Sequence, residues 1–160
     1  LLLCSSDAAE RRWLSRAFAD GAVTKVYLAL VHGATHRKGV IRRPLLDARR
    51  GEPLPAVTRY RRLQRLGGFS YLQLVPATGR KHQLRRHLQG LGHPVVGDTR
   101  YPTRVFRPVP AFPGRLWLHA AELILPDGRA FRSALPPELI DHLAALGASR
   151  DQGRNCSDRS

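Results

Sequence analysis

Apolar and polar residues alternate along several short stretches of the chain, and a period of two residues is typical of β-strands. We expect strands over residues 25–31, 57–66, 69–75, 116–125 and 129–133, with shorter extended pieces between residues 39 and 54. Gly67-Gly68 separates the second and third strands by two residues, which is a strong signal for a β-hairpin. Residues 1–4 are apolar and have the composition of the end of a buried strand.

Three other stretches repeat their apolar residues every three to four positions, as amphipathic helices do. They cover residues 8–19, 78–91 and 136–146. Ser6 or Asp7 can cap the first helix and Thr78 the second. Gly92 stands where a left-handed residue often ends a helix, and Gly147 is expected to stop the third helix. This mixture of strands and helices predicts an α+β fold dominated by antiparallel strands.

The length of the chain, 160 residues, fits a single domain, and no repeat or linker divides it. We expect the folded domain over residues 1–146 and a polar, disordered tail over residues 147–160. The sequence contains no Met and opens on three leucines. These two features lead us to expect a fragment that begins inside a strand.

Charge narrows the range of partners. Lys and Arg number 27 against 12 acidic residues, which gives a formal net charge of +15 at pH 7. No acidic residue occurs from Pro53 to Gly97, although eight Lys and Arg residues lie there. A field of one sign attracts polyanions, so we expect a nucleic acid as partner. A basic surface that has no partner is the alternative that charge alone leaves open.

The cysteines indicate the compartment. Cys4 and Cys156 form no CxxC pair, which argues against a zinc site or a disulfide framework. A reducing compartment is therefore the default, and we expect a cytoplasmic protein. No apolar stretch approaches the roughly 20 residues of a membrane span, so we expect no membrane association.

The densest candidate for chemistry is the segment Thr78-Gly79-Arg80-Lys81-His82-Gln83-Leu84-Arg85-Arg86-His87-Leu88. A glycine turn leads here into a helix whose first positions carry cations instead of acids. Cations at the N-terminus oppose the helix dipole, and a bound anion would compensate them. An amphipathic core helix with a solvated basic face is the other interpretation of the same pattern.

Three motifs, taken together, resemble the RluA-type RNA pseudouridine synthases. Residues 78–101 contain Thr-Gly-Arg-x-His-Gln-Leu-Arg-x-His followed by Leu-Gly-His-Pro-x-x-Gly-Asp-x-x-Tyr. Residues 23–33 resemble the family's Lys-x-Tyr-x-Ala-x-Val-x-Gly strand, and residues 116–120 resemble its late strand. The order and spacing are those of the family over residues 1 to about 146, and the wording of the first motif is nearest to tRNA pseudouridine synthase C and its relatives.

The resemblance implies a mixed, mostly antiparallel sheet with flanking helices and a central RNA-binding cleft. It also implies that a uridine of tRNA or rRNA is flipped out of the RNA and isomerised to pseudouridine without a cofactor. In the family, an Asp in a His-Arg-Leu-Asp-x-x-Thr-Ser-Gly motif begins the reaction. This chain contains no such motif. We therefore expect the catalytic Asp upstream of Leu1 and no activity from the chain alone.

The resemblance carries two catalytic residues onto this sequence. Tyr27 matches the tyrosine that stacks on the target base, and Arg85 matches the basic residue that ion-pairs with the catalytic Asp. The candidates for contact with RNA are Lys25, Arg80, Lys81, His82, Leu84 and Arg86. We interpret His82 and His87 as hydrogen-bonding residues of the cleft and expect no metal, because the histidine spacings fit no metal-binding motif. Asp98 is expected to accept backbone N–H bonds in its loop.

Two functions remain open from the sequence. The first is an RNA pseudouridine synthase that acts as a monomer. The second is a non-catalytic, basic RNA-binding domain derived from the same family, and the residues just upstream of Leu1 would separate the two. A metal-dependent nuclease is disfavoured because the sequence lacks the carboxylate cluster that such an enzyme requires.

Overall fold

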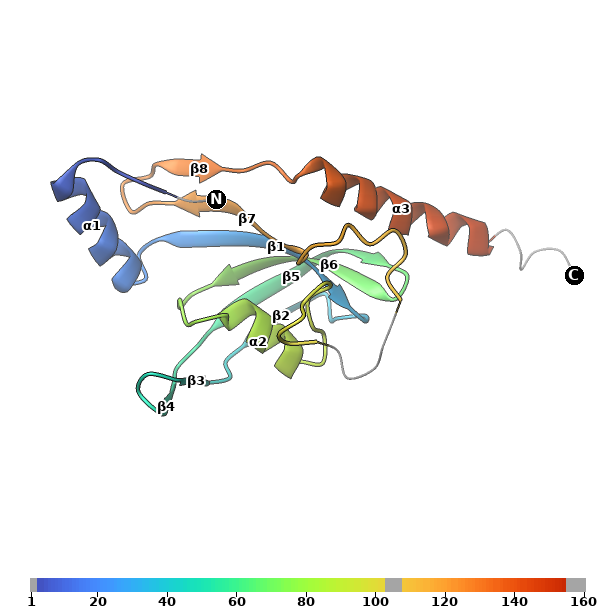
Figure 1. Ribbon diagram of the computed structural model, residues 1–160, viewed down its shortest axis with the longest axis horizontal. Coiled ribbons are helices and arrows are strands. Elements are labelled where there is room, and N and C mark those ends of the chain that lie inside the picture. Colours follow the sequence, from blue (N-terminus) through green and yellow to red (C-terminus); the bar gives the residue numbers. More distant parts are fainter. Residues whose placement is uncertain (1–2, 103–107, 155–160) are drawn as a thin grey trace, which may run out of the picture.

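The computed structural model describes residues 3–102 and 108–154. Its main sheet has six strands in the order β2-β5-β6-β1-β7-β8 (Figure 1). The strands are β1 (Thr24–His32), β2 (Lys38–Ile41), β5 (Thr58–Leu66), β6 (Phe69–Pro76), β7 (Leu118–Ile124) and β8 (Ala130–Arg132). A separate hairpin consists of β3 (Leu45–Asp47) and β4 (Glu52–Leu54). The helices are α1 (Ala8–Ala19), α2 (Gln83–Gly90) and α3 (Pro137–Arg154).

The predicted α+β class and the dominance of antiparallel pairing are confirmed. Within the described ranges every strand pair is antiparallel, including the isolated bridge between Val31 and Val95, so the mixed character that we expected is not found there. The hairpin predicted at Gly67-Gly68 joins β5 to β6, with Leu66 opposite Phe69.

One face of the sheet carries α2. Tyr27 of β1 lies opposite Leu74 of β6, which in turn lies opposite Tyr60 of β5, so these three side chains share a face. Thr58 shares that face with Tyr60 because they are two residues apart on β5, and the Thr58 hydroxyl is hydrogen-bonded to α2. The core on this side includes the buried Leu84 and Leu88 of α2.

The opposite face carries α3. Leu30 of β1 pairs with Tyr71 of β6, and the Tyr71 ring meets Trp117 edge-on with the centroids 5.6 Å apart. Trp117 is fully buried, and its indole N–H donates to Nδ1 of His142 on α3 at 3.0 Å. A buried indole that finds a polar partner in this way ties the helix to the sheet without leaving an unsatisfied donor.

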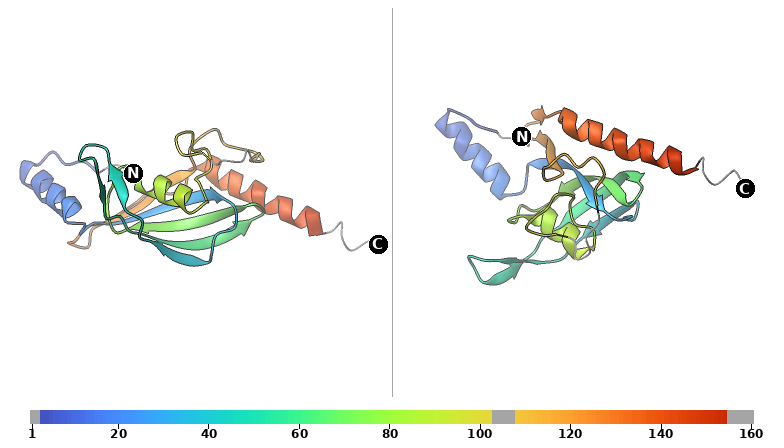
Figure 2. Two further views of the ribbon diagram at one scale, coloured as in Figure 1. Left: turned by 90° about the horizontal axis from the view of Figure 1, so that it is seen from below. Right: turned by 45° about the vertical axis from the view of Figure 1, so that its right-hand side comes forward.

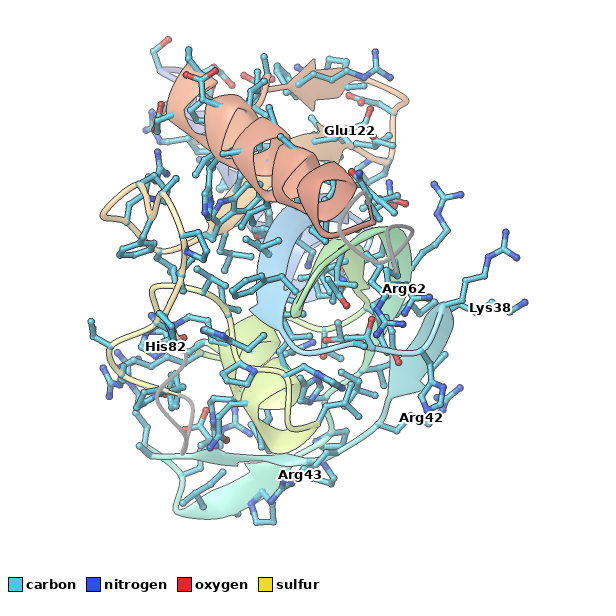
Figure 3. All side chains as sticks on the ribbon, turned by 90° about the vertical axis from the view of Figure 1, so that its right-hand side faces the viewer. Lys38, Arg42, Arg43, Arg62, His82 and Glu122 are labelled. Atoms are coloured by element: carbon cyan, nitrogen blue, oxygen red, sulfur yellow. The ribbon has the colours of Figure 1, made fainter. Side chains whose placement is uncertain are left out.

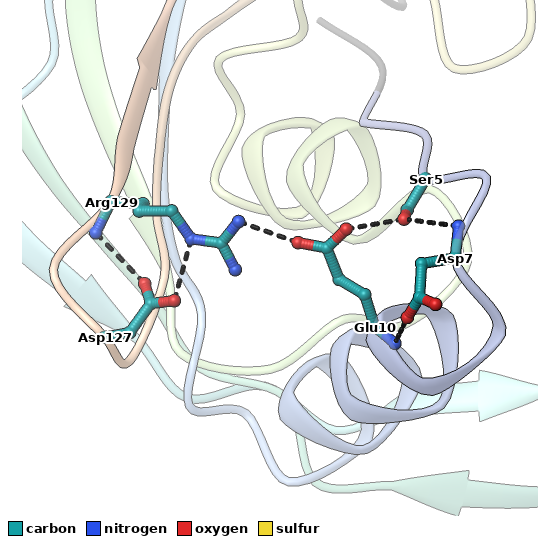
Figure 4. A network of polar contacts seen from close by, with 5 residues as sticks. All are labelled: Ser5, Asp7, Glu10, Asp127 and Arg129. Atoms are coloured by element: carbon teal, nitrogen blue, oxygen red, sulfur yellow. Dashed lines mark hydrogen bonds and ion pairs between the residues drawn. The ribbon is translucent and has the colours of Figure 1, made fainter.

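Helix α1 has the bounds that the sequence predicts, and Asp7 caps it by accepting the Glu10 backbone N–H at 2.6 Å. Its first turn is held against the β7–β8 turn by Arg129, whose guanidinium donates to Glu10 at 2.7 Å and to Asp127 at 2.8 Å (Figure 4). Arg129 also lies over the Trp13 ring, 5.5 Å from the ring centroid. These surface contacts join the first turn of α1 to the β7–β8 turn.

The expected strand at the start of the chain is not found in its described part. Residues 1–2 lie outside the described residues, and Leu3 and Cys4 belong to no strand. Leu3 instead packs, partly buried, against a small second core between α1 and β7, formed by Leu14, Ala17, Val23, Leu123 and Leu125. An apolar residue can meet a core from a loop as well as from a strand, so composition alone did not decide the conformation.

The prediction that α2 begins near Thr78 is wrong, because the helix starts at Gln83. The Thr78 hydroxyl donates to the Gln83 side chain at 2.7 Å and accepts the Val57 backbone N–H at 3.0 Å, which holds residue 78 to β5 outside the helix. His82 then has a left-handed backbone with φ of 53°, and a helix cannot run through such a residue.

The prediction that Gly147 stops α3 is also wrong, since the helix continues to Arg154. Residues 147–154 of the expected disordered tail are therefore helical, and residues 155–160 lie outside the described part. A glycine inside a helix costs only about 1 kcal/mol relative to alanine. Packing outweighs this cost, because the neighbouring Leu146 is buried in the main core and Gly147 faces Leu66 of β5.

The loop after α2 depends on a glycine. Gly97 has φ of 76°, and a Cβ added there would lie 2.4 Å from the backbone oxygen of Arg115. On either side of it, Val96 accepts the Trp117 backbone N–H and Asp98 forms the ion pair described below. The close approach of the two backbones thus sets the position of Asp98.

We predict that Gly97→Ala destabilises the protein by roughly 2–5 kcal/mol, because a left-handed alanine costs about 1–2 kcal/mol and overpacking adds roughly 1–3 kcal/mol. Gly128→Ala is the matched control: Gly128 has φ of 88° but nothing within 4 Å of an added Cβ. Gly128→Ala should therefore lose only the roughly 1–2 kcal/mol of a left-handed alanine. Urea unfolding of both variants measures the difference, and equal losses would contradict the proposed close contact.

Candidate nucleic-acid interface

A cleft of about 660 Å³ opens between hairpin β3–β4, the loop before α2 and residues 100–101. Figures 1 and 2 show the hairpin beside α2. The cleft is lined by five Lys and Arg side chains and one carboxylate, Asp47. The five cations are Arg49, Arg80, Lys81, Arg86 and Arg100. Asp47 already accepts the backbone N–H groups of Arg49 and Arg50, bonds that lower its pKa, so its charge serves first to form the hairpin turn. The charge of the cleft is consequently of the sign that attracts an anion.

Gln83 fixes the loop that brings two of these cations to the cleft. Its side-chain amide donates to the Val57 carbonyl at 3.0 Å and to the Thr58 hydroxyl at 3.1 Å. Its Oε1 accepts from the Thr78 hydroxyl at 2.7 Å and from the Arg80 backbone N–H at 3.0 Å. Gln83 was not among the residues predicted from the sequence, although its place inside the Thr-Gly-Arg-x-His-Gln motif was a usable signal. All the hydrogen-bonding capacity of this buried amide is used to hold residues 78–83 to β5.

His82 lies at the rim of the cleft. Its Nδ1 is 3.2 Å from the Tyr101 hydroxyl, and the two rings meet edge-on. Desolvation lowers the pKa of His82, and the nearby charges of Arg85, Arg100 and Lys81 lower it further. The imidazole is therefore neutral at pH 7, and it offers the cleft a hydrogen-bonding group that adds no charge.

Arg85 forms a bidentate ion pair with Asp98. Its Nε and Nη2 each donate to a carboxylate oxygen at 2.7 Å, and the Asp98 side chain is fully buried. Asp98 also accepts the backbone N–H groups of Arg100 and Tyr101, which is the loop role predicted for it. Burial alone would raise the pKa of Asp98, but the Arg85 hydrogen bond and the backbone bonds outweigh it and lower the pKa. The guanidinium also lies over the Tyr101 ring, 5.2 Å from the ring centroid.

The structure therefore gives Arg85 a partner that was not predicted from the sequence. Its pairing with an Asp outside this chain stays a prediction. The two bonds to Asp98 use two of the five N–H donors of a guanidinium, so a second carboxylate can still be held. Arg86, one position along α2, donates instead to the Leu46 carbonyl at 3.0 Å and lines the cleft. Arg85 and Arg86 are adjacent on α2, yet Arg85 contacts Asp98 and Arg86 contacts the β3–β4 hairpin.

Lys25 and Tyr27 lie on β1, outside the residues that line the cleft. Lys25 is 8% exposed, burial lowers its pKa, and a Cβ added at Gly79 would be 3.9 Å from its Nζ. Tyr27 packs against the core that includes Leu84, and burial raises the pKa of its phenol. Both residues share the sheet face of α2, and Lys25 reaches the loop that carries Arg80 and Lys81.

His87 is not a residue of the cleft, contrary to our expectation. It is fully buried beneath α2, where its Nδ1 is 2.9 Å from the Thr58 hydroxyl and its Nε2 is 2.9 Å from the Arg43 carbonyl. The expectation failed because His82 precedes the helix in a left-handed conformation, whereas His87 lies within α2 on the side that faces Thr58. Among the described residues no group of three or more His, Cys, Asp or Glu side chains is arranged to hold a metal ion, and no described helix is long and apolar enough to cross a membrane.

Residues 1–90 match the protein family described as RNA pseudouridylate synthase. The chain belongs to this family. Among curated pseudouridylate synthases it is 38% identical over 149 residues to tRNA pseudouridine synthase C of Pectobacterium carotovorum, covering 78% of this chain and 39% of the relative. It is 38% identical over 122 residues to the dual-specificity RNA pseudouridine synthase RluA of Vibrio cholerae, covering 69% of this chain and 48% of the relative. The chain thus spans less than half of the length of these two relatives.

Solved pseudouridylate synthase structures share the fold. Human RNA pseudouridylate synthase domain containing 1 superposes with a TM-score of 0.68 at 31% identity, over 88% of this chain and 65% of that one. Human RNA pseudouridylate synthase domain containing 4 gives a TM-score of 0.72 at 25% identity, over 89% and 69%. The recognised resemblance and the fold class that it implied are therefore confirmed.

We predict that Asp98→Asn destabilises the pseudouridylate synthase domain by about 3 kcal/mol at pH 7, because it leaves the Arg85 guanidinium without its buried anion. The pKa of Asp98 is lowered in the folded state, so its stabilisation exists above the unfolded pKa of about 3.9 and is lost as the pH falls through the folded value. The difference between wild type and variant should persist from pH 7 to about 5 and shrink below about 4.

Glu122→Gln is the control, since it also breaks a carboxylate–arginine pair, but with Arg132, whose side chain is 76% exposed. A surface pair of this kind contributes about 0–1 kcal/mol. Thermal unfolding across this pH range measures both variants. Equal losses in the two would show that the Arg85–Asp98 pair does not support the loop.

Proposed function

We propose that the protein to which this chain belongs isomerises uridine to pseudouridine in tRNA or rRNA, without a cofactor and in the cytoplasm. The observation that carries the proposal is the cleft at the start of α2, where five cations face one already engaged carboxylate. An RNA strand supplies the phosphates that such a cleft can bind. The names of the relatives support RNA as the substrate class, since one is a tRNA pseudouridine synthase and another is a dual-specificity RNA pseudouridine synthase.

In the proposed reaction, the C1′–N1 bond of a flipped uridine breaks, the uracil turns, and C1′ bonds to C5. C5 then loses its proton, and N1, which carried none in uridine, gains one, so atoms balance without another reactant. Tyr27 is proposed to stack on the base and take part in proton transfer at C5, because a flipped base needs an aromatic face. The raised pKa of its phenol keeps Tyr27 protonated at pH 7. The nucleophilic Asp is assigned to no residue of this chain.

Arg85 is proposed to pair with that Asp and keep it ionised. The pair with Asp98 supports this role, because it fixes the guanidinium plane before a second carboxylate arrives. Arg80, Lys81 and Arg86 are proposed to bind phosphates in the cleft. Lys25 is assigned the same role at the loop of Gly79, and His82 offers a neutral hydrogen bond.

A non-catalytic, basic RNA-binding domain is the second candidate, because the five cations of the cleft would bind RNA whether or not a reaction follows. Pseudouridine formation separates the two functions. We propose that a protein containing this chain and the motif converts uridine in RNA as a monomer. RNA binding without conversion by that protein would support the second candidate.

The chain is predicted to bind RNA mainly through charge. The logarithm of the association constant should fall with the logarithm of the salt concentration by about 0.7 for each phosphate bound by a cation. If each of the five cleft cations binds one phosphate, the slope is about −3.5. Filter binding from low to high salt measures it, and an affinity independent of salt would refute an electrostatic interface.

Arg85→Met is predicted to lower mainly the reaction rate, and Arg86→Met mainly the RNA affinity. Arg85→Met should nearly abolish the single-turnover rate, because the orphaned Asp takes up a proton and is then no nucleophile, while RNA affinity falls less. Arg86→Met should weaken RNA binding and reduce the salt slope by about 0.7, with a smaller effect on the rate at saturating RNA. Single-turnover kinetics and filter binding, with Arg85→Lys as a charge-retaining comparison, test this. The reverse pattern would show that the two roles are exchanged.

A further inference from the structure

A second basic groove lies on the outer side of α2, away from the cleft. It has a volume of about 440 Å³ and lies between edge strand β2 and the C-terminal end of α2. The buried His87 is one of its lining residues, and its exposed basic side chains are His36, Lys38, Arg42 and Arg43. All four are exposed, and Figure 3 shows Lys38, Arg42 and Arg43 following one another along this edge.

Close contacts at Gly39 and Gly90 set the shape of the groove. A Cβ added at Gly39 would lie 2.6 Å from the Tyr60 ring, so glycine allows this buried ring to lie directly against the β2 backbone. Arg43 covers the end of α2, where a Cβ added at Gly90 would be 2.7 Å from its Nη1, and its carbonyl is bound by the buried His87. The groove floor is therefore firm, and the charged groups stand at its sides.

The charges of the groove have no acidic partner in the described part of the chain. The ion pairs found there involve none of Lys38, Arg42 and Arg43. The sequence contains no acidic residue between Asp20 and Asp47. Cations gathered in a concave site without counter-charges repel one another, and a bound polyanion relieves that repulsion.

The groove and the cleft lie at the two ends of α2, and a short segment of chain runs from one to the other. The connection from β2 to β3 passes from Arg42 and Arg43 in the groove to Leu45 and Leu46, which line the cleft. Helix α2 and the residues that flank it contribute His82 and Arg86 to the cleft and Gly90 and Leu91 to the groove. The helix has eight residues, so its two ends are roughly 12 Å apart. This distance exceeds the spacing of about 3.4 Å between neighbouring nucleotides of a stacked strand, so the two sites would contact different nucleotides.

We propose that this groove binds the sugar–phosphate backbone of the substrate RNA outside the target nucleotide. The inference rests on the proposed function, since it extends the path of the same RNA from the cleft past α2. The contacts would be mainly to phosphates, because the groove offers three Lys and Arg side chains but no exposed Phe, Tyr or Trp ring on which a base could stack. It therefore adds affinity for long RNA without adding sequence preference.

The test compares two RNA probes on the full chain, a uridine trinucleotide and a stem–loop of about 20 nucleotides. The groove variant is Arg42→Gln with Arg43→Gln, and Lys38→Gln is an independent single change. Arg12→Gln with Arg16→Gln, on exposed positions of α1, removes the same charge elsewhere. Melting temperatures of all variants should stay within a few degrees of wild type, because every replaced side chain is exposed.

The groove double variant should reduce the magnitude of the stem–loop salt slope by about 1.4, and Lys38→Gln by about 0.7. At 0.1 M salt this corresponds to a roughly fivefold weaker affinity for each cation–phosphate pair that is removed. Trinucleotide affinity should change less than about twofold, and the α1 variant should change stem–loop affinity far less than the groove variant. These results would support the groove as an RNA path.

Equal weakening of both probes, or the same weakening in the α1 variant, would overturn the inference. The charges would then act only through net charge or protect the edge strand from pairing with another chain. If Arg86→Met weakens binding of both probes while the groove variant weakens neither, the inference fails and the proposed function stands. If wild-type binding is independent of salt, the proposed electrostatic function fails as well.

Discussion

The placement of α2, and of the cations at its start, depends on one hydroxyl group, that of Thr58, which fixes the helix to the sheet. It accepts a hydrogen bond from Gln83 at the start of the helix and is bonded to His87 one turn later. The Arg43 carbonyl can only accept, so Nε2 of His87 carries the proton and the Thr58 hydroxyl donates to Nδ1. Burial lowers the pKa of His87, which agrees with a neutral ring. A single threonine thus accepts from one helical residue and donates to another, and it joins α2 to β5 at two points along the helix.

The distribution of charge divides the molecule functionally. Residues 21–97 contain 15 of the 27 Lys and Arg residues but only two of the 12 acids. Four of the five ion pairs among the described residues lie outside this segment and join α1, the β7–β8 hairpin and α3 to their neighbours. The fifth, between Arg85 and Asp98, joins the segment to the following loop. One half of the fold therefore uses its charges for its own stability, and the other half leaves them available to a polyanion.

Local signals in the sequence were sufficient for the elements whose ends are set locally. Asp7 caps α1 through a bond to a residue three positions away, and Gly67-Gly68 closes a two-residue hairpin, so both were predictable. The start of α2 was missed because it depends on Val57 and Thr58, which lie more than 20 residues before it. Patterns that involve neighbouring positions are visible in a sequence, whereas contacts between distant strands are not.

The candidate site shows the same limit. Arg80, Lys81, His82 and Arg86 were predicted as a group, and the structure brings them to one cleft because they are neighbours in the chain. Arg49 and Arg100 join them from the hairpin and the later loop, and no spacing rule pointed to these two. Tyr101 also lines the cleft; it stands in the Gly-Asp-x-x-Tyr motif but was not assigned to the site. The extension of α3 past Gly147 was missed for a related reason, since the burial of Leu146 against the sheet outweighs the weak helix propensity of a glycine.

Under the proposed function, the pair between Arg85 and Asp98 also affects the chemistry. A lone guanidinium beside a carboxylate would depress its pKa strongly and make it a weaker base and nucleophile. Asp98 already neutralises part of the Arg85 charge, and it holds the guanidinium in a fixed plane through two bonds of 2.7 Å. The remaining N–H groups can then orient a second carboxylate with less loss of its basicity. Arg85 would thereby keep the second carboxylate ionised and also orient it, as an attack on a single carbon atom of a flipped nucleotide requires.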